Sequence, residues 1–270
     1  MKIALVGLGR TGKIVAEYLL EMGVLTMVLC KQNSFNVNAD LGEILGGRNN
    51  GIVVEPIDHL EKRFFCKQPD VLIDFSSSSF LRDNIMVLAQ CGVNVVTAVT
   101  DYEPVEIEKI KSIAEQGNIG VIMAPNITYG VNVLMLMAEI AAELMNEYDF
   151  EIVEEHHKHK KDKPSGTARK IADKISNNLL VYRDIDAHAV RAGGIVGKHK
   201  VLICNEFEKV EISHESFSRV AFAQGAYKAA QFICGRQGFY EMSDIFEEER
   251  KQRQRKAATY KTEIGELDLA

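Results

Sequence analysis

A glycine-rich turn near the start of this 270-residue chain places the strongest constraint on its fold. The run Ile3–Val6 is continuously apolar, which is typical of a parallel strand buried on both faces. It leads directly into the pattern G-x-G-x-x-G, formed by Gly7, Leu8, Gly9, Arg10, Thr11 and Gly12. Because a segment with apolar residues at helical spacing follows, the glycines allow a tight turn and the close approach of a pyrophosphate to a helix N-terminus. The pattern predicts a dinucleotide-binding unit; a glycine turn in an unliganded α/β unit is the alternative.

The end of the next apolar run bears on which nucleotide is bound. In dinucleotide-binding folds an Asp or Glu at this point normally hydrogen-bonds the adenosine ribose 2′-OH. Here the run 25–29 is followed by Cys30, Lys31, Gln32 and Asn33, which include no acid and one cation. A 2′-phosphate could therefore sit against Lys31, so NADPH is favoured as cofactor over NADH, which stays an alternative. A solvated surface lysine is the other interpretation of Lys31.

Buried runs alternate with helical segments through the first half of the chain. Apolar strands are predicted at residues 71–75, 93–97 and 120–124, with helices between them. This alternation predicts an α/β fold with an N-terminal Rossmann-type, doubly wound parallel sheet, whose ligand lies across the carboxyl ends of the strands. Two strand exits are therefore candidates for cofactor binding. They comprise Ala98, Val99 and Thr100, and then Ala124, Pro125, Asn126 and Ile127.

The pattern of the chain changes near residue 127. Residues 150–154, 201–204 and 209–214 alternate between apolar and polar, which is typical of half-exposed strands. They predict a second, smaller α+β domain with a mixed open sheet. The predicted domains are residues 1–126 with 219–246 for the dinucleotide, 127–218 for substrate binding and oligomerisation, and 247–270 as a charged C-terminal extension.

Two segments of this second half carry further predictions. The helix predicted over 133–145 contains Met135, Met137 and Met145, a stripe that is typical of core packing. Beyond Phe246 the chain is highly charged, which predicts an exposed helix or a disordered extension.

Composition excludes several classes of function. The formal net charge of −6 argues against nucleic acid as the main partner. The sequence has no apolar run long enough to span a bilayer, so no membrane association is expected. Its five cysteines show neither CxxC nor Cys/His ligand spacing, which predicts reduced thiols in a cytoplasmic protein and no metal site.

The stretch Glu154–Ala168 has the highest density of side chains that can exchange protons or bind anions. Three of the seven histidines fall between residues 156 and 159, and four lysines, an aspartate and a Pro-Ser-Gly-Thr turn complete the run. Unpaired charge is too costly for a core, so the choice lies between a solvated loop and a site. Because the run ends where helical spacing begins, free backbone N–H groups are expected at that helix start and attract anions. The combination predicts a pocket for a carboxylated small molecule that has to be protonated.

The same stretch follows the signature Glu-x-His-His-x-x-Lys-x-Asp-x-Pro-Ser-Gly-Thr-Ala, and over residues 1–246 the chain resembles the dihydrodipicolinate reductase family. Three further matches occur in the expected order. They are Ala124-Pro125-Asn126 with Gly130-Val131-Asn132, then Val190-Arg191-Ala192-Gly193-Gly194-Ile195-Val196-Gly197, and finally Ser218-Arg219 with Phe222-Ala223-x-Gly225-Ala226.

The resemblance implies an NAD(P)H-dependent oxidoreductase that reduces a cyclic, unsaturated imine dicarboxylate to tetrahydrodipicolinate, in lysine and diaminopimelate biosynthesis. By position in the signature, His156 is the expected catalytic histidine and Lys160 the expected proton donor. His157 would contact substrate, as would Arg219. Ser165, Gly166 and Thr167 would hold a substrate carboxylate. The resemblance also implies a homotetramer built through the second sheet.

Three features depart from the family. The turn from Gly7 to Gly12 is one residue shorter than the family's G-x-x-G-x-x-G, and Ala98-Val99-Thr100-Asp101 stands where the family has Gly-Thr-Thr-Gly. The charged tail beyond Phe246 has no family counterpart. Two alternatives therefore accompany the reductase: a paralogue of the same fold that reduces another imine or keto acid, and a non-catalytic nucleotide-binding protein that uses its tail for partners.

Overall fold

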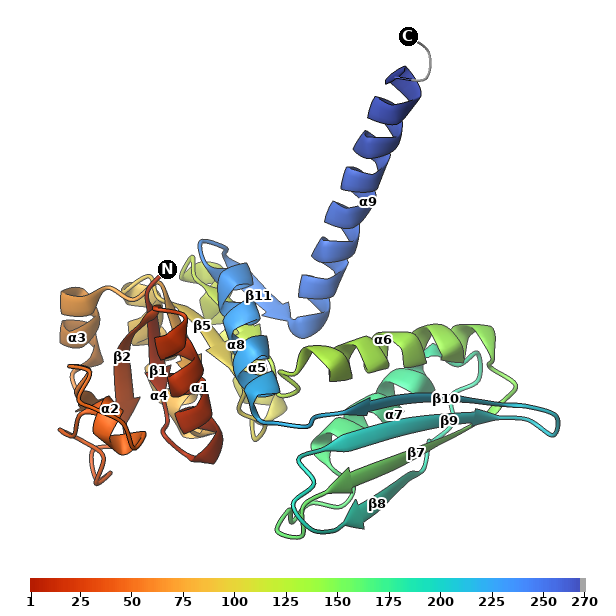
Figure 1. The fold of residues 1–270 in the computed structure, drawn as a ribbon, viewed down its shortest axis with the longest axis horizontal. Helices are drawn as coiled ribbons and strands as arrows, with labels where there is room; N and C mark the ends of the chain where they lie inside the picture. Colours follow the sequence, from red (N-terminus) through yellow and green to blue (C-terminus); the bar gives the residue numbers. More distant parts are fainter. Residues whose placement is uncertain (268–270) are drawn as a thin grey trace.

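The computed structural model describes residues 1–267, with side chains through residue 256, and contains two separate β-sheets (Figure 1). The larger sheet has seven parallel strands in the order β11-β6-β5-β4-β1-β2-β3. They are β1 (Ile3–Val6), β2 (Leu25–Cys30), β3 (Val54–Pro56), β4 (Val71–Asp74), β5 (Asn94–Thr97), β6 (Gly120–Met123) and β11 (Gly238–Glu241).

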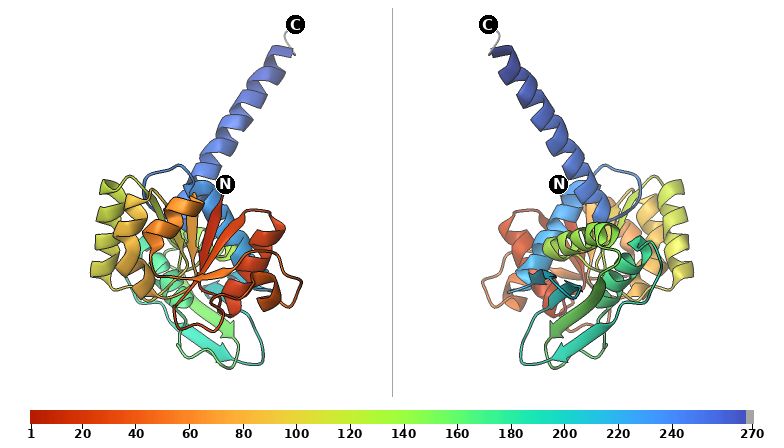
Figure 2. Two further views of the ribbon diagram at one scale, coloured as in Figure 1. Left: turned by 90° about the vertical axis from the view of Figure 1, so that its left-hand side faces the viewer. Right: turned by 90° about the vertical axis from the view of Figure 1, so that its right-hand side faces the viewer.

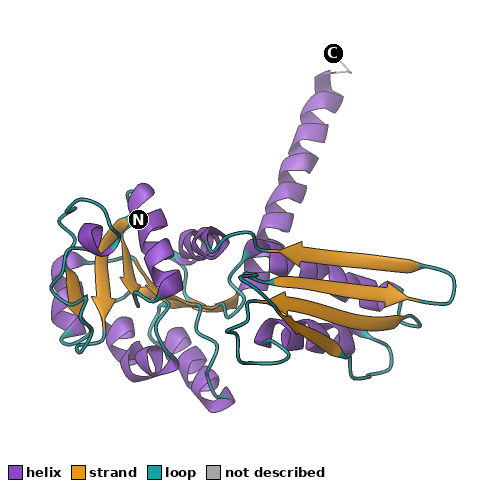
Figure 3. Cartoon of the chain, turned by 60° about the horizontal axis from the view of Figure 1, so that its bottom comes forward, coloured by secondary structure: helices purple, strands orange, loops and turns teal. Residues whose placement is uncertain are grey.

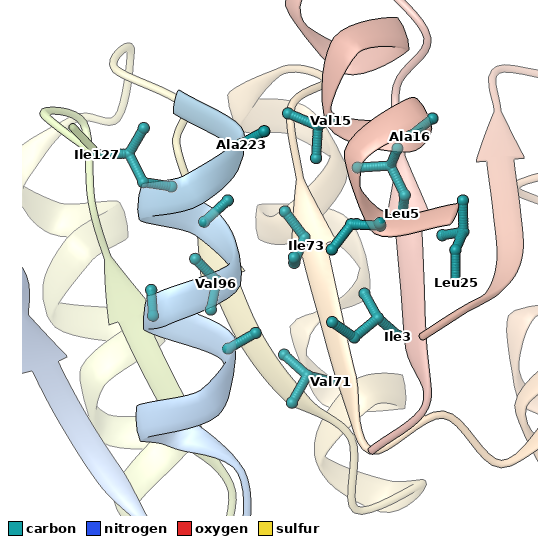
Figure 4. Close-up of a cluster of buried hydrophobic side chains, with 14 of the residues drawn as sticks. Ile3, Leu5, Val15, Ala16, Leu25, Val71, Ile73, Val96, Ile127 and Ala223 are labelled. Atoms are coloured by element: carbon teal, nitrogen blue, oxygen red, sulfur yellow. The ribbon is translucent and has the colours of Figure 1, made fainter. Parts of the chain in front are cut away.

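Helices cover both faces of this sheet, as the strand–helix alternation predicts. The helices associated with it are α1 (Arg10–Glu21), α2 (Leu41–Ile44), α3 (Leu60–Lys67), α4 (Ser78–Gln90), α5 (Pro104–Gln116) and α8 (Val220–Ile233). Side chains of α1 and α8 pack on one face, together with alternate strand residues such as Leu5 and Ile73 (Figure 4). Side chains of α3, α4 and α5 pack on the opposite face, against residues such as Val6 and Leu72. Strands β1, β4, β5 and β6 are buried at every position, so the prediction of a doubly wound sheet is confirmed.

The topology defines where a ligand can bind. Strand β1 pairs with β2 on one side and with β4 on the other, so the direction in which strands are added reverses between β1 and β4. In open α/β sheets the ligand crevice lies at such a switch point, beyond the carboxyl ends of the strands.

The chain returns to the large sheet after it has built the small one. Helix α8 brings Ala223, Ala226 and Ala229, each fully buried, onto the face that α1 also covers. Strand β11 pairs in parallel with β6 and closes that edge of the sheet. A Cβ on Gly225 would lie 1.9 Å from the carbonyl oxygen of Ile127, so only glycine permits this approach of α8 to the start of the second half.

The smaller sheet is mixed, as expected, with strand order β10-β9-β7-β8 (Figure 3). Its strands are β7 (Asp149–His156), β8 (Ala187–Arg191), β9 (Lys198–Cys204) and β10 (Lys209–Glu215), and its helices are α6 (Tyr129–Leu144) and α7 (Gly166–Asn178). Burial alternates along β7, because one face of the sheet packs against α6 and α7 while the side chains of the other face are mostly half-buried. Strand β8 was not predicted from the sequence. It is only five residues long and forms the edge of the sheet, where it pairs in parallel with β7.

Two predictions for the helices are refined. Met135 is buried, but Met137 is 47% exposed, so the prediction that the whole methionine stripe packs in the core is wrong for this residue. It lies on the side of α6 that faces away from the sheet. The charged tail continues α9 (Met242–Leu267), which begins with the buried residues Met242, Ile245 and Phe246 and then projects from the body of the protein (Figure 2). Residues 268–270 of the predicted extension lie outside the described part. None of the described helices combines the length and apolar character of a membrane span.

Candidate active site

A hollow of about 370 Å³ lies at the switch point between β1 and β4. Gly7, Leu8 and Gly9 line one side of it, and Ser76 and Ser77, which follow β4, line the other. The glycine turn and the serine run therefore meet across the carboxyl edge of the sheet, at the position where the topology predicts a nucleotide.

The three glycines of the turn differ in the space around them. Gly7 has φ +96, and a Cβ there would lie 2.6 Å from the carbonyl oxygen of Phe75. A Cβ on Gly12 would lie 2.0 Å from the carbonyl oxygen of Gly7, so this glycine permits α1 to pack closely on β1. By contrast, a Cβ on Gly9 would meet nothing within 4 Å. The protein thus needs glycine for packing at Gly7 and Gly12, whereas Gly9 leaves open space, as expected where a pyrophosphate approaches.

The start of α1 fits an anion. Its N-cap is Gly9, which has no side chain to accept hydrogen bonds from the first turn, and that turn carries no acidic residue. Unpaired N–H groups and the positive end of the helix dipole therefore face the turn.

Lys31 lies at the rim of the same hollow, as the sequence predicts for a contact with the adenosine end. It is exposed, and Ser34 and the buried Asn36 line the hollow beside it. The acidic Asp83, from α4, also lines the hollow, and its carboxylate pairs with Arg82 at 2.9 Å. The rim therefore offers one cation and several hydrogen-bonding groups to a phosphate.

A larger cleft of about 870 Å³ lies between the two sheets. Its walls bring together residues that are more than 200 positions apart in the sequence. The predicted site residues that line it are Arg10, Thr11, Ala98, Thr100, Pro125, Asn126, Ile127, His156, His157, Lys160, Gly166, Thr167 and Arg219. Within the described residues, Gly12, Val99, Ala124 and Ser165 are not among the residues that line either hollow, and both Ala124 and Ser165 are buried.

The divergent turn 98–101 is anchored to the end of β4 and β5. The N–H of Ala98 donates to the carbonyl oxygen of Asp74 at 3.0 Å, and the N–H of Val99 donates to Oγ1 of Thr97 at 3.3 Å. Thr100 and Asp101 then face the cleft. Burial raises the pKa of the Asp74 carboxyl to about 6, against the opposing hydrogen bonds from Ser76 and Thr97.

A hydrogen bond connects the side of the cleft predicted to bind cofactor with the side predicted to bind substrate. The hydroxyl of Thr167, in the first turn of α7, donates to Oδ1 of Asn126, which follows β6. Both residues were predicted for the site, Asn126 for cofactor and Thr167 for substrate, and the structure brings them into direct contact.

His156 is the last residue of β7 and is buried, and a hydrogen bond fixes its ring. Its Nδ1 hydrogen-bonds Oε2 of Glu154, which lies two positions earlier on the same face of the strand. Its Nε2 points to the other side, where a Cβ on Gly197 would lie 3.2 Å away. Burial lowers the pKa of His156, while the hydrogen bond and the charge of Glu154 act in the opposite direction.

Lys160 lies on the loop that leaves β7, beside the cleft. Its Nζ is 2.9 Å from Oδ1 of Asp162, and the N–H of Gly166 donates to the other carboxylate oxygen of Asp162 at 3.3 Å. Burial acts to raise the pKa of Asp162, but the hydrogen bond and charge of Lys160 outweigh it and hold that pKa below its ordinary value. The predicted proton donor is therefore tied to the start of α7.

The Ser-Gly-Thr turn forms the N-terminus of α7. Ser165 is the N-cap, and its Oγ accepts a hydrogen bond from the N–H of Ala168 at 3.1 Å. This use of the Ser165 side chain satisfies one of the free N–H groups of the first turn. Gly166 and Thr167, which both line the cleft, are the residues of this turn that a substrate carboxylate can reach.

Positive charge gathers around His157 in the cleft. Burial lowers the pKa of His157, and the nearby cations Arg219, Arg10 and Lys160 lower it further, as does His159. Nδ1 of His157 is buried and has no hydrogen-bond partner among the described residues. An anionic ligand would relieve both conditions, since it neutralises the charge and can accept a hydrogen bond.

Several residues of the site had no predicted role. Arg191, at the end of β8, donates from Nη2 to Oε1 of Glu154 at 2.6 Å and to the carbonyl oxygen of Asp162 at 2.5 Å. His199 lies beside His156, and burial lowers its pKa to about 3. His214 also lines the cleft, with an unpaired Nδ1. The alternation of Glu154 and His156 on one strand face was a usable signal for the contact between those two residues. Arg191, His199 and His214 come from other strands, which only the fold brings together.

A Rossmann-type sheet with an open glycine turn, facing a histidine- and lysine-lined cleft beside a second sheet, is the arrangement expected of an oxidoreductase that uses a pyridine nucleotide. A family model described as "Dihydrodipicolinate reductase, N-terminus" matches residues 1–127, and one described as "Dihydrodipicolinate reductase, C-terminus" matches residues 130–246. The chain belongs to the dihydrodipicolinate reductase family.

Curated relatives agree with this assignment. A 4-hydroxy-tetrahydrodipicolinate reductase from Methanosarcina mazei is 36% identical over 251 residues, which cover 88% of this chain and 95% of the relative. The protein of the same name from Ralstonia pickettii is 34% identical over 267 residues, covering 91% and 99% of the two chains.

Solved structures share the fold. A dipicolinate-bound dihydrodipicolinate reductase from Paenisporosarcina sp. TG-14 superposes with a TM-score of 0.75 at 23% identity, covering 89% of this chain and 97% of the other. An amine dehydrogenase from Mycobacterium smegmatis gives a TM-score of 0.59 at 13% identity, covering 88% and 94%. The resemblance recognised in the sequence is therefore confirmed at the level of family and fold.

Proposed function

We propose that this protein reduces 4-hydroxy-tetrahydrodipicolinate, or the dihydrodipicolinate derived from it, to tetrahydrodipicolinate with NAD(P)H, as a step of lysine and diaminopimelate biosynthesis. The observation that carries the proposal is the intact signature loop 154–168, which faces the glycine turn 7–12 across one cleft. The family names of the chain and its relatives support the same reaction.

The cofactor would be held by the turn Gly7–Gly12 and the strand exits 98–100 and 124–127, and when bound it supplies the hydride. Addition of a hydride to the conjugated C=C–C=N system of the substrate leaves negative charge at its other end, so a proton has to be supplied there. Lys160 is the proposed proton donor, because its ammonium group lies in the cleft on a loop tied to α7. A positioned acid of this kind contributes about 10²–10⁴-fold in rate.

The substrate carries two carboxylates, and the cleft offers two regions that suit them. Gly166 and Thr167 present the N-terminus of α7, where backbone N–H groups and the helix dipole favour an anion. His157 and Arg219, which lie near each other in the cleft, present hydrogen-bond donors and positive charge. Binding at both regions would orient the ring between Lys160 and the nicotinamide side.

The proposal is tested by mixing the purified protein with NADPH and substrate freshly made by the preceding synthase, and by following loss of the reduced nicotinamide absorbance. Steady turnover that is severely reduced in Lys160→Ala and His156→Ala is the expected result. If the parent shows no turnover, or if both variants behave like the parent, the assignment of the reaction and its residues is wrong.

NADPH is the proposed preferred cofactor. The support is the absence of an acid directly after β2 and the position of Lys31 at the rim of the hollow. The ratio of kcat/KM for NADPH to that for NADH should exceed one and should fall about tenfold in Lys31→Glu, with little change in the NADH value. A ratio that does not respond to the Lys31 substitution contradicts this part of the proposal.

We assign the two sheets to two domains, residues 1–126 with 219–246 and residues 127–218, with 247–270 as an extension. The exposed face of the four-stranded sheet is the proposed contact surface of a homotetramer, and light scattering of the purified protein measures its mass. A monomer at micromolar concentration would contradict that assembly. A cytoplasmic location is proposed because all five cysteines are free thiols, as in a reducing compartment.

A further inference from the structure

The carboxylate of Glu154 is the meeting point of three separate parts of the site. It is fully buried on β7, and it accepts hydrogen bonds from His156 Nδ1 on the same strand, from the N–H of Ser165 at 3.1 Å, and from Arg191 on β8 at 2.6 Å. One side chain thus connects the catalytic histidine, the N-terminus of α7 and the neighbouring strand.

This geometry fixes which ring nitrogen of His156 carries hydrogen. An ionised carboxylate can only accept hydrogen bonds, so Nδ1 of His156 must donate. Burial acts to raise the pKa of Glu154, but Arg191 and His156 outweigh it and hold that pKa below its ordinary value, so the carboxylate is ionised at neutral pH. In the neutral imidazole, Nε2 is then left without hydrogen, and Nε2 is the atom on the side of Gly197 and the cleft.

Arg191 extends the same arrangement to the loop of the proton donor. Its Nη2 donates both to Glu154 and to the carbonyl oxygen of Asp162, and Asp162 in turn pairs with Lys160 at 2.9 Å. The guanidinium side chain is only 5% exposed, so its contacts are with protein rather than water. Displacing Arg191 would therefore loosen His156 and Lys160 together.

We propose that Glu154, oriented by Arg191, is the positioning residue of this active site. It holds His156 as the Nδ1–H tautomer with Nε2 facing the substrate, and through Arg191 it fixes the position of the loop that carries Lys160. The inference rests on the proposed reductase function for its kinetic consequence. Its structural consequence, the tautomer of His156, can be read without any turnover.

A metal ion is the competing role for this cluster. Glu154, His156 and His199 bring ligand-type atoms within 4.8 Å of one another. However, both carboxylate oxygens already accept hydrogen bonds, and the guanidinium of Arg191 lies against one of them. A second cation beside Arg191 would be repelled, so the arrangement favours orientation of His156 over metal binding.

The test combines kinetics with NMR of protein labelled with ¹⁵N in its histidines, the signal of His156 being assigned by its loss in His156→Gln. The parent should show His156 protonated at Nδ1. Glu154→Gln has an amide that cannot accept from His156 and from Arg191 and Ser165 at once, so His156 should shift to the Nε2–H tautomer or to a mixture. We expect kcat to fall roughly 10²-fold, with KM for NADPH within about twofold of the parent.

Two further variants keep the test decisive if Glu154→Gln folds poorly. Glu154→Asp retains the acceptor charge and should preserve the Nδ1–H tautomer and recover part of kcat. Arg191→Lys keeps the positive charge but loses the paired contacts, and should lower kcat with the cofactor KM unchanged. Glu155→Gln, on the opposite face of the same strand, is the matched control and should change neither tautomer nor kcat.

The outcomes separate this inference from the reaction itself. If the parent turns over substrate but Glu154→Gln keeps both the Nδ1–H tautomer and the parental kcat, Glu154 has no positioning role although the reductase assignment stands. If the parent is inactive and the tautomer shifts as expected, the orientation of His156 by Glu154 holds and the reaction has been wrongly assigned. A zinc-dependent change in the His156 and His199 signals of the parent at stoichiometric metal would overturn the inference in favour of a metal site.

Discussion

Two buried carboxylates, one on each side of the cleft, are held in opposite ways. Asp74 ends β4 on the proposed cofactor side, and Glu154 lies near the end of β7 on the proposed substrate side; both are 0% exposed. Burial raises the pKa of Asp74 to about 6, since its carboxylate accepts hydrogen bonds from the N–H and hydroxyl of Ser76 and from the hydroxyl of Thr97, all of them uncharged. Burial acts on Glu154 as well, but Arg191 and His156 lower its pKa below the ordinary value.

The contrast extends to the way the two regions are built. On the cofactor side the glycine turn presents backbone atoms rather than side chains. Gly9 leaves space for a ligand, while Gly7 and Gly12 permit close packing. The substrate side is made of paired charges that position one another, through Glu154 and Asp162. The first region should therefore be sensitive to atoms that are added, and the second to charges that are removed.

The largest effect is expected for Lys160→Met. It removes the proposed acid while keeping most of the side-chain volume, so kcat should fall about 10²–10⁴-fold. The Kd of NADPH, measured by fluorescence titration, should stay within about threefold, because the cofactor side is built separately. Lys158→Met, at an exposed position of the same loop that does not line the cleft, is the control. A large loss of NADPH affinity in Lys160→Met would show that the two sides are not separable.

Arg191→Met should cost about 3–5 kcal/mol in the free energy of unfolding at pH 7.5, because it leaves the Glu154 carboxylate buried without its cation. In the parent, the lowered pKa of Glu154 gives stability that is present above the unfolded-state pKa and is lost as pH falls through the folded-state value. Without Arg191 that contribution disappears, so the deficit should shrink toward pH 4, where Glu154 can be protonated. Urea denaturation across this range measures it, with the exposed Arg48→Met as control; a deficit that is independent of pH would contradict the charge-pairing argument.

Asp74→Asn should raise the free energy of unfolding at neutral pH, whereas Arg191→Met lowers it. The folded-state pKa of about 6 lies above the ordinary value of 3.8, so the folded parent keeps a proton that the unfolded chain has lost, and its stability falls as pH rises from about 4 to 6. An asparagine does not titrate, so the free energy of unfolding of the variant should rise relative to that of the parent over this interval. The difference should reach roughly 2–3 kcal/mol at pH 7.5. The exposed Asp149→Asn should follow the parent curve. Parallel stability curves for Asp74→Asn and the parent would show that Asp74 is not held in this way.

The smallest effect is a matched pair of alanine substitutions in the glycine turn. Gly9→Ala adds a methyl group to open space, so the melting temperature should be unchanged while the Kd of NADPH rises about tenfold, or about 1.4 kcal/mol. Gly12→Ala places its Cβ 2.0 Å from the carbonyl oxygen of Gly7 and should lower the melting temperature by several degrees. If Gly9→Ala binds NADPH as tightly as the parent, the open space beside Gly9 is not the pyrophosphate site.

The sequence predicts one side of the site better than the other for a physical reason. Cofactor-side features are local: strand, glycines and helix follow within residues 3–21, and the structure has each of them where it was expected. Local order also explains why the helix start predicted at the end of the run 154–168 is found at Gly166, since a helix start depends on a few consecutive residues. Spacing and residue type therefore suffice wherever the contacts are near in the chain.

Contacts between distant strands could not be predicted in the same way. Arg191 reaches Glu154 only because β8 pairs in parallel with β7 in one register, opposing Arg191 to His156. Neither the existence of β8 nor that register follows from the sequence of its five residues. None of the five is buried, so the strand shows no apolar face that would predict it. The exposure of Met137 was missed for a related reason, since the apolar residues of α6 do not reveal which side receives the sheet.

The return of the chain to its first sheet also affects how the protein is made. The buried alanines of α8 and the pairing of β11 with β6 complete a core that begins at Ile3. However, α8 begins at Val220 and β11 at Gly238, whereas β6 ends at Met123, so the whole of the smaller sheet is synthesised in between. A ribosome-bound chain that ends near residue 126 would cover this face with α1 but not with α8, and the apolar surface left bare is prone to aggregation. The substrate side must therefore emerge before the cofactor side can close, so the last step of folding completes the first domain to be translated.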